Sequence, residues 1–202
     1  LDEWQVEPQL WNLVRREVDN RQLSGQFILT GSAVPQGDAE RHTGAGRFSF
    51  LRMRPMTLFE TGQSTGAMSL TELMAGNVSS SGATSLTIPD IAERITMGGW
   101  PAQQSKSVRD ATRAARDYLE QVQQVDVDRV AGGKRDPVKV GRLLNSLARN
   151  VATEATTIAL AADAGGSAGP LARNTVSDYL NALERLMIVE NQPAWSPHLR
   201  SR

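Results

Sequence analysis

The sequence predicts a chain in two parts, an α/β segment followed by a mostly α-helical segment. In the first part, helical spacing over residues 8–20 is followed by a short apolar run at 26–30 that is typical of a buried strand. Buried strands that alternate with helices favour a parallel sheet. In the second part, from residue 89 onward, apolar side chains recur every three or four positions, which predicts amphipathic helices.

The elements of the first part follow in order. Pro8 suits the first turn of the helix at 8–20, and Ser24-Gly25 breaks the helical pattern. Polar and glycine-rich residues at 33–46 predict a loop. The other elements expected here are the buried strand at 26–30, a second strand at 48–53 and a short helix at 56–60.

A change of composition then separates the two parts. Residues 61–88 are dominated by serine, threonine and glycine, which predicts a flexible linker with a short helix at 69–75. The elements expected after the linker are helices at 89–97, 107–125, 138–152, 156–164 and 171–187, and a terminal strand at 189–195.

The composition excludes several classes of protein. The 202 residues carry 22 basic and 22 acidic side chains, and this zero net charge argues against a nucleic-acid binder that acts through bulk electrostatics. The absence of cysteine excludes disulfides, thiolate metal sites and cysteine nucleophiles. No apolar run approaches the roughly 20 residues of a membrane span. We therefore expect a cytoplasmic protein with no membrane partner.

An acidic pair and a polar strand end carry the first chemical signal. Asp2-Glu3 precedes the first helix, and Thr30-Gly31-Ser32 closes the predicted strand after it. An isolated acidic pair is most often a solvated turn or the first turn of a helix. An acidic pair, a helix of about a dozen residues and a strand that ends in Thr or Ser is, however, the order found in P-loop ATPases.

Four segments together extend this likeness: residues 1–5, 27–32, 44–47 and 51–60. With them the chain resembles the second half of the ATPase core of prokaryotic predicted AAA+-superfamily (P-loop) ATPases, in which a helical, winged-helix-like domain of unknown function follows the core. The resemblance implies three segments. They are the distal half of the ATPase core at 1–60, the linker at 61–88, and a helical C-terminal domain at 89–202 with a winged-helix-like segment at 139–195.

The resemblance also implies roles for individual residues. Asp2 would bind ATP-associated Mg²⁺ through water, because Mg²⁺ keeps several waters and takes few carboxylates. Glu3 would orient the attacking water, and Thr30 or Ser32 would sense the γ-phosphate. Arg47 would be an arginine finger that acts across a subunit interface. A structural role for Arg47 beside a strand is an equal alternative.

The phosphate-binding loop of such ATPases is missing from the sequence. No G-x-x-x-x-G-K-[ST] motif occurs, and Gly44-Ala-Gly46 has neither the spacing nor the Lys that would replace it. Both ends of the chain also look cut. We therefore expect a fragment of an ATPase that binds ATP and Mg²⁺ only in the intact protein. Whether the chain itself is an enzyme stays open, and the fragment is expected to be inactive.

A helix-turn-helix-like pattern carries the second signal. Residues 157–165 resemble a first helix and turn, and residues 174–183 resemble a second helix. The side chains expected to point inward are Val176, Tyr179, Leu180 and Leu183, and those expected to point outward, toward base edges, are Arg173, Asn174 and Ser177. The long connection and the mixed charges of the second helix place a structural or protein-binding role ahead of DNA contact.

Two alternatives to an ATPase fragment stay open. One is a winged-helix module that binds nucleic acid or regulates transcription. The other is a protein-interaction or oligomerisation domain, whose partner is another protein or a second copy of the chain. A stripe of basic residues, Arg109, Arg113 and Arg116, is expected to be a solvated, salt-bridged helix face.

Overall fold

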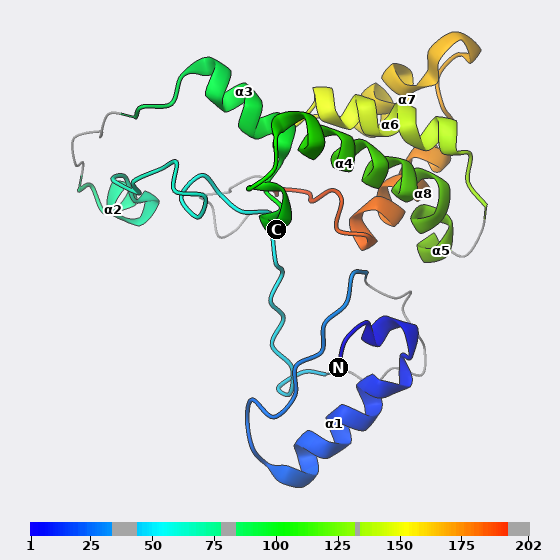
Figure 1. Ribbon diagram of the computed structural model, residues 1–202. Coiled ribbons are helices and arrows are strands. Elements are labelled where there is room, and N and C mark those ends of the chain that lie inside the picture. Colours follow the sequence, from blue (N-terminus) through cyan, green and yellow to red (C-terminus); the bar gives the residue numbers. More distant parts are fainter. Residues whose placement is uncertain (34–43, 78–83, 132–133, 194–202) are drawn as a thin grey trace. The chain divides into compact units, whose positions relative to one another are not determined.

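The computed structural model describes residues 1–33, 44–77, 84–131 and 134–193 (Figure 1). The chain divides into two compact units, one made of Leu1–Ser49 with Gln121–Arg202 and the other of Phe50–Glu120. Within the described residues every regular element is a helix and none is a strand. The predicted α/β fold of the first part, an ATPase-core remnant with a sheet, is therefore wrong, whereas the predicted helices of the second part are present.

The helix predicted at 8–20 is confirmed as α1 (Gln9–Arg21), which follows a short 3₁₀ turn, η1 (Trp4–Val6). Helix α1 ends where Gln22 adopts a left-handed conformation and its N–H bonds to the carbonyl of Val18. Its buried residues are Trp11 and Val14, and the Trp11 ring stacks on Phe48 with ring centroids 3.9 Å apart. An aromatic contact thus fixes α1 to the chain that follows it.

The strands predicted at 26–30 and 48–53 are extended segments without a sheet. A strand needs neighbours on a ladder, because a lone two-stranded pair is marginal in water. Among the described residues, 26–30 pair with the beginning of the chain through three main-chain hydrogen bonds. Along 48–53, Phe50, Leu51 and Met53 are 83%, 89% and 88% exposed, so no described strand covers them.

In the unit Phe50–Glu120, a turn and two helices come first. The helix predicted at 56–60 is a turn, in which Thr57 and Glu60 bond to each other through side chain and backbone. The helices predicted at 69–75 and 89–97 are confirmed as α2 (Leu70–Met74) and α3 (Ile88–Met97). Helix α3 begins at a capping box in which Thr87 and Asp90 exchange hydrogen bonds.

The same unit continues through η2 (Pro101–Gln103) into α4 (Val108–Gln121). Trp100 packs edge-to-face on Tyr118 of α4, with centroids 4.5 Å apart. The N–H of Met56 donates to the carbonyl of Gly99 at 2.6 Å, and a Cβ on Gly99 would lie 2.6 Å from the carbonyl oxygen of Met56. A glycine at 99 is therefore what lets the two backbones meet.

The long helix predicted at 107–125 changes its geometry at its end. After α4 the chain forms a π-helical turn, η3 (Val122–Asp126), and then α5 (Val127–Ala131). Val122 and Val127 are buried. The wider π turn lets both valines face the interior of their unit across the change of helix.

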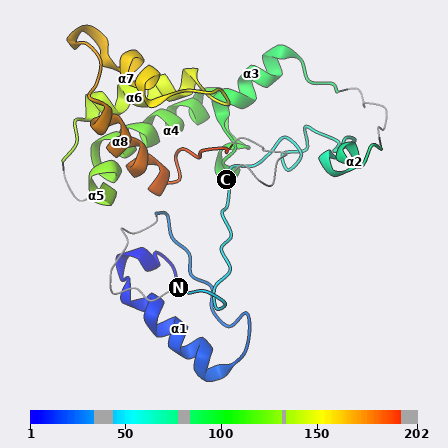
Figure 2. The ribbon, with the colours of Figure 1, turned by 180° about the vertical axis from the view of Figure 1, so that it is seen from behind.

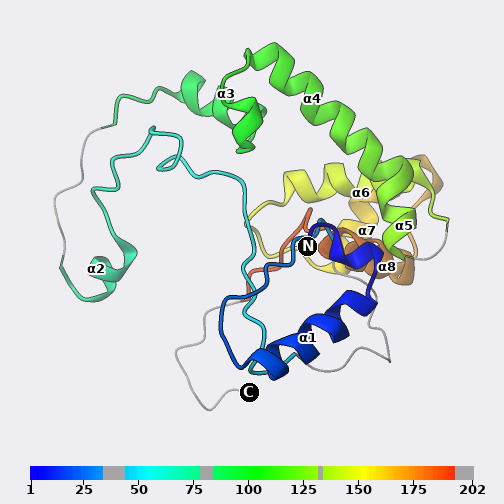
Figure 3. The same ribbon diagram turned by 60° about the horizontal axis from the view of Figure 1, so that its bottom comes forward.

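Helices α6 (Pro137–Arg149), α7 (Thr157–Gly165) and α8 (Arg173–Arg185) form the best-packed part of the molecule. The side chains of Asp136 and Thr156 cap α6 and α7, and a 3₁₀ turn, η4 (Gly166–Ala168), leads toward α8. Helix α6 contacts α7, and α7 and α5 contact α8 (Figures 2 and 3). Residues that are fully buried here include Val140, Leu143, Val176 and Leu183.

The strand expected at 189–195 is absent as far as the structure describes it. Residues 186–193 leave α8 as irregular chain, and residues 194 and 195 lie outside the described residues. The N–H of Ile188 still bonds to the carbonyl of Leu183, which closes the end of α8. The described part of this segment is therefore no wing strand.

Candidate functional site

Five polar side chains gather where the beginning of the chain meets residues 28–32. We call this set, which consists of Asp2, Glu3, Gln5, Thr30 and Ser32, the N-terminal polar cluster. Three main-chain bonds hold it together. The amino group of Leu1 donates to the carbonyl of Ile28 at 2.8 Å, the N–H of Thr30 to that of Leu1 at 2.9 Å, and the N–H of Trp4 to that of Thr30 at 3.1 Å.

One pair in this cluster is Asp2 with Thr30. The hydroxyl of Thr30 donates to a carboxylate oxygen of Asp2, and both side chains are exposed. The Thr30 hydroxyl, followed by the backbone N–H of Glu3, lowers the pKa of Asp2 below its ordinary value. Asp2 is therefore ionised at neutral pH, as a ligand of a cation must be.

The second pair is Glu3 with Ser32. The hydroxyl of Ser32 donates to Oε2 of Glu3 at 3.0 Å. Glu3 has φ 50° and ψ 41°, a left-handed conformation that costs a residue with a side chain about 1–3 kcal/mol. A strained backbone of this kind persists only where the surroundings hold it, and it is common at functional sites.

Sequence reasoning missed one member of the cluster, Gln5, and the glycine that makes room for it, Gly31. The Gln5 amide Nε2 donates to Oε2 of Glu3 and, at 3.2 Å, to the hydroxyl of Ser32. Gly31 lies against Gln5, since a Cβ on Gly31 would fall 2.2 Å from the Gln5 Oε1 atom. The spacing of Gln5 from Glu3 is the sequence signal that could have identified Gln5. A glutamine two residues after a glutamate reaches back to it through the tight turn η1.

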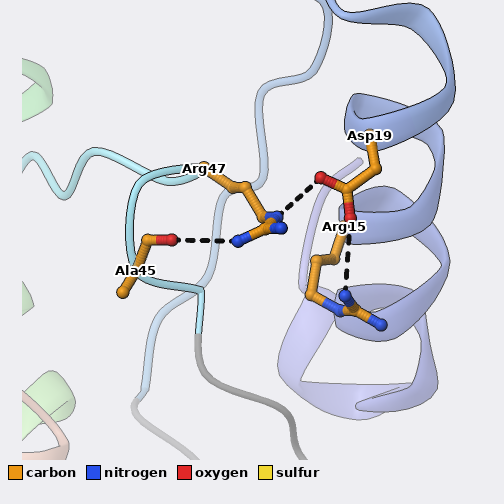
Figure 4. A network of polar contacts seen from close by, with 4 residues as sticks. All are labelled: Arg15, Asp19, Ala45 and Arg47. Carbon is orange, nitrogen blue, oxygen red and sulfur yellow. Dashed lines mark hydrogen bonds and ion pairs between the residues drawn. The ribbon is translucent and has the colours of Figure 1, made fainter.

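Arg47, the expected arginine finger, does not join the cluster through any described contact. Its Nε lies 2.7 Å from Oδ1 of Asp19 on α1, and its Nη1 donates to the carbonyl of Ala45 at 3.2 Å (Figure 4). Asp19 also pairs with Arg15 at 3.5 Å. In this conformation Arg47 serves as a surface tether between α1 and the turn that begins at Gly44.

The donor chemistry of the cluster fits Mg²⁺ in one respect. Asp2 offers an exposed, ionised carboxylate, and magnesium in nucleotide sites takes one or two carboxylates while phosphates and water complete its shell. In the part of the chain that the structure describes, no group of three or more His, Cys, Asp or Glu side chains forms a metal site. A cation here would therefore need a nucleotide to supply most of its ligands.

The second candidate site is the outward face of α8. As the pattern predicts, Arg173, Asn174 and Ser177 are exposed at its first two turns. Of the inward residues, Val176, Tyr179 and Leu183 are buried and Leu180 is half-buried. The acidic Asp178 on this helix pairs with Arg135 at 2.8 Å, which removes part of its repulsion for an anionic partner.

The basic stripe of α4 is solvated and forms no salt bridge within the part of the chain that the structure describes. Arg109, Arg113 and Arg116 are exposed, and none of the three forms an ion pair with another residue that the structure describes. The expected pairing with neighbouring acids is therefore wrong. Asp110 instead bonds to the Ser107 hydroxyl at the beginning of α4.

The structure thus defines a class of protein. It has a helical C-terminal domain, and a candidate polar site lies at the beginning of the chain. Residues 88–202 match the family described as a domain of unknown function, DUF8612. The chain belongs to this family. No curated protein and no solved structure matches it. Among the described residues, no helix has the length and apolar character needed to cross a membrane. The N-terminal polar cluster lies outside the matched residues.

Proposed function

We propose that the N-terminal polar cluster is the hydrolytic edge of an ATP-binding site. The observation that carries the proposal is the pairing of two acids with two hydroxyls, Asp2 with Thr30 and Glu3 with Ser32, around one short main-chain pairing. The sequence order resembles that of the ATPase family, and the contacts give each of the four residues a partner consistent with its proposed role.

The roles follow from the chemistry of each group. The ionised Asp2 would hold a magnesium ion through water, and that ion would supply charge neutralisation at the phosphates. Glu3, with its exposed carboxylate, orients the attacking water and accepts its proton. Thr30 and Ser32 offer hydroxyl groups beside the two carboxylates and report the presence of the γ-phosphate.

The proposal requires Arg47 to act as an arginine finger, although in the structure its side chain contacts Asp19. An arginine finger must reach the transferring phosphoryl group of a neighbouring subunit, so Arg47 has to leave Asp19 before it acts. Because their ion pair is solvent-exposed, its loss costs little. The Asp19–Arg47 contact is thus compatible with a resting position of the arginine.

The proposal places the phosphate-binding loop outside these 202 residues, since the sequence contains no such motif. The 202-residue chain alone is then expected to bind ATP no more tightly than millimolar, as titration calorimetry would show. The intact protein works in the cytoplasm, where ATP is available. Micromolar binding by the 202-residue chain would contradict this division of the site.

The direct test is Glu3→Gln in the gene product that includes a phosphate-binding loop. The amide keeps the size of the side chain but cannot accept the proton, so turnover should fall by about 10²–10⁴-fold while ATP binding is spared. Thr61→Val, far along the chain, is a control that should leave turnover unchanged. Equal turnover in the wild type and Glu3→Gln would remove Glu3 from the mechanism.

A nucleic-acid interface on α8 is the second candidate function. The observation in its favour is that Arg173, Asn174 and Ser177 are all exposed on one helix end. It predicts salt-dependent DNA binding that Arg173→Ala weakens. A gel shift without any bound DNA at low salt would end this candidate.

A protein-interaction or oligomerisation module is the third. Its support is the apolar side of α3, where Ile88 and Ile95 are 83% and 77% exposed. Light scattering separates a monomer from a homo-oligomer, and Ile95→Asp should return an oligomer to monomers. A monomeric wild type over the accessible concentration range would exclude self-association.

A further inference from the structure

We propose that Gln5 is a positioning residue that holds the Glu3 carboxylate in its working orientation. This inference rests on the proposed hydrolytic role of Glu3. It concerns a residue to which neither the sequence pattern nor the family description assigns a role.

The contacts form a closed triangle. Nε2 of Gln5 donates to Oε2 of Glu3 and to the hydroxyl of Ser32, and that hydroxyl donates to the same Oε2 atom. Two donors therefore converge on one carboxylate oxygen. No described residue donates to the other oxygen of Glu3, and the side chain is exposed. The triangle thus leaves one defined oxygen to take a proton from water.

The Gln5 amide keeps this position at a cost. Its Oε1 atom is buried and has no hydrogen-bond partner among the described residues. A buried polar atom without a partner is unfavourable, and a solvated glutamine side chain would avoid the penalty. The Nε2 atom of the amide has hydrogen-bond partners, and the Oε1 atom has none in the described part of the chain. The contacts of Nε2 with Glu3 and Ser32 therefore account for the position of the Gln5 side chain.

Two backbone features support the same reading. Gly31 leaves the room that the Gln5 amide occupies, because a methyl group there would meet Oε1 at 2.2 Å. Glu3 itself is held at a left-handed φ of 50°. The strained backbone of Glu3 and the unpaired Oε1 atom of Gln5 both serve the orientation of a single carboxylate.

The chemistry also explains why the residue is glutamine. A glutamate at position 5 would repel Glu3 and could not donate to it at neutral pH. A methionine has nearly the same length but carries no donor. Gln5→Met is therefore the substitution that removes the hydrogen bonds while it retains most of the packing.

The first test uses the 202-residue chain and does not depend on activity. In ¹H–¹⁵N NMR, the side-chain amide signals of Gln5 should move when Glu3→Ala or Ser32→Ala removes a partner. The amide signals of Gln9, which is exposed at the beginning of α1, should stay in place. Gln5 signals that do not respond to either substitution would overturn the proposal.

The second test uses the loop-containing gene product. Gln5→Met should lower kcat by about tenfold to a hundredfold with KM and the Kd for ATP within twofold of the wild type, because a misplaced catalytic group loses rate rather than substrate binding. Gln9→Met should leave both unchanged. In a Glu3→Gln background, Gln5→Met should have no further effect on kcat.

The outcomes separate the two proposals. A wild type without ATP turnover overturns the proposed function and this inference with it. Turnover that Glu3→Gln abolishes and Gln5→Met leaves unchanged overturns the inference alone. Equal losses of kcat and of ATP affinity in Gln5→Met would show a structural role and also overturn it.

Discussion

The apolar side chains of residues 50–53 are exposed, whereas those of α6, α7 and α8 are buried. Leu51 is 89% exposed, and Leu143 on α6 is fully buried. Helices close their main-chain hydrogen bonds within one segment, so each needs only a neighbour for its apolar stripe. An extended segment needs a second strand for its hydrogen bonds and a covering layer for its side chains. In the described residues, the helices α6, α7 and α8 have neighbours that bury their apolar stripes. Within the same part of the chain, the extended segment at 50–53 has neither a partner strand nor a covering layer.

Two leucines, one buried on α6 and one exposed at 50–53, provide the most direct test of this difference in burial. Leu143→Ala should cost about 2–5 kcal/mol in the free energy of unfolding, because it leaves a cavity in the packed helices. Leu51→Ala makes the same chemical change at an exposed side chain and should stay within about 0.5 kcal/mol. Urea unfolding followed by circular dichroism measures both. Equal losses would mean that residue 51 is buried in solution.

A second prediction sharpens how tightly the helical part is packed. A Cβ on Gly165, at the end of α7, would lie 2.6 Å from the backbone of Pro170. A backbone atom, unlike the end of a flexible side chain, cannot rotate away from this contact. Gly165→Ala should therefore destabilise the fold by about 1–3 kcal/mol.

Gly141 on α6 provides the control. A Cβ there would meet the far end of the Gln123 side chain at 2.6 Å, which can rotate away. Gly141→Ala should be neutral or stabilising by up to about 1 kcal/mol, since alanine is the better helix former. Thermal unfolding compares the two variants, and a larger loss at residue 141 would contradict the packing described.

The third prediction concerns what holds residues 1–49 together. The ion pair between Arg47 and Asp19 is exposed at both ends, so Asp19→Asn should cost no more than about 1 kcal/mol and less at high salt. Phe48→Ala removes the ring stacked on Trp11 and should change the tryptophan fluorescence, which Asp19→Asn should leave alone. The opposite ranking would make the charge, and not the aromatic stack, the main contact.

The smallest expected effect is a titration shift at the cluster. The hydrogen bond from Thr30 lowers the pKa of Asp2, so its contribution to stability is present above the ordinary pKa and is lost as the pH falls through the lowered one. Thr30→Val should raise the pKa of Asp2 toward its ordinary value, as carboxyl ¹³C NMR would measure. Asp163, whose pKa is lowered by Ser146 and Arg149, should titrate as before. An unchanged pKa of Asp2 in Thr30→Val would exclude the hydrogen bond.

The sequence predicted the helices well because their signals are local. The apolar periods of α1 and α8 lie within the helices that they define. The Thr87–Asp90 capping box and the Asp136 cap, which the structure shows, are equally local. The candidate site was predicted in part. Asp2, Glu3, Thr30 and Ser32 were named from their order along the chain, and the structure brings all four together, although their roles remain predictions.

What the sequence determined by itself was therefore most of the helices, the buried residues of α8 and the polar residues at the beginning of the chain. Tertiary structure alone decided three further points. It left residues 26–30 and 48–53 without a sheet, it brought the Gln5 amide onto Glu3, and it paired Arg47 with Asp19. The physical reason is range. A helix is specified by residues three or four positions apart, whereas strand partners and side-chain contacts across 28 positions depend on which segments meet in space.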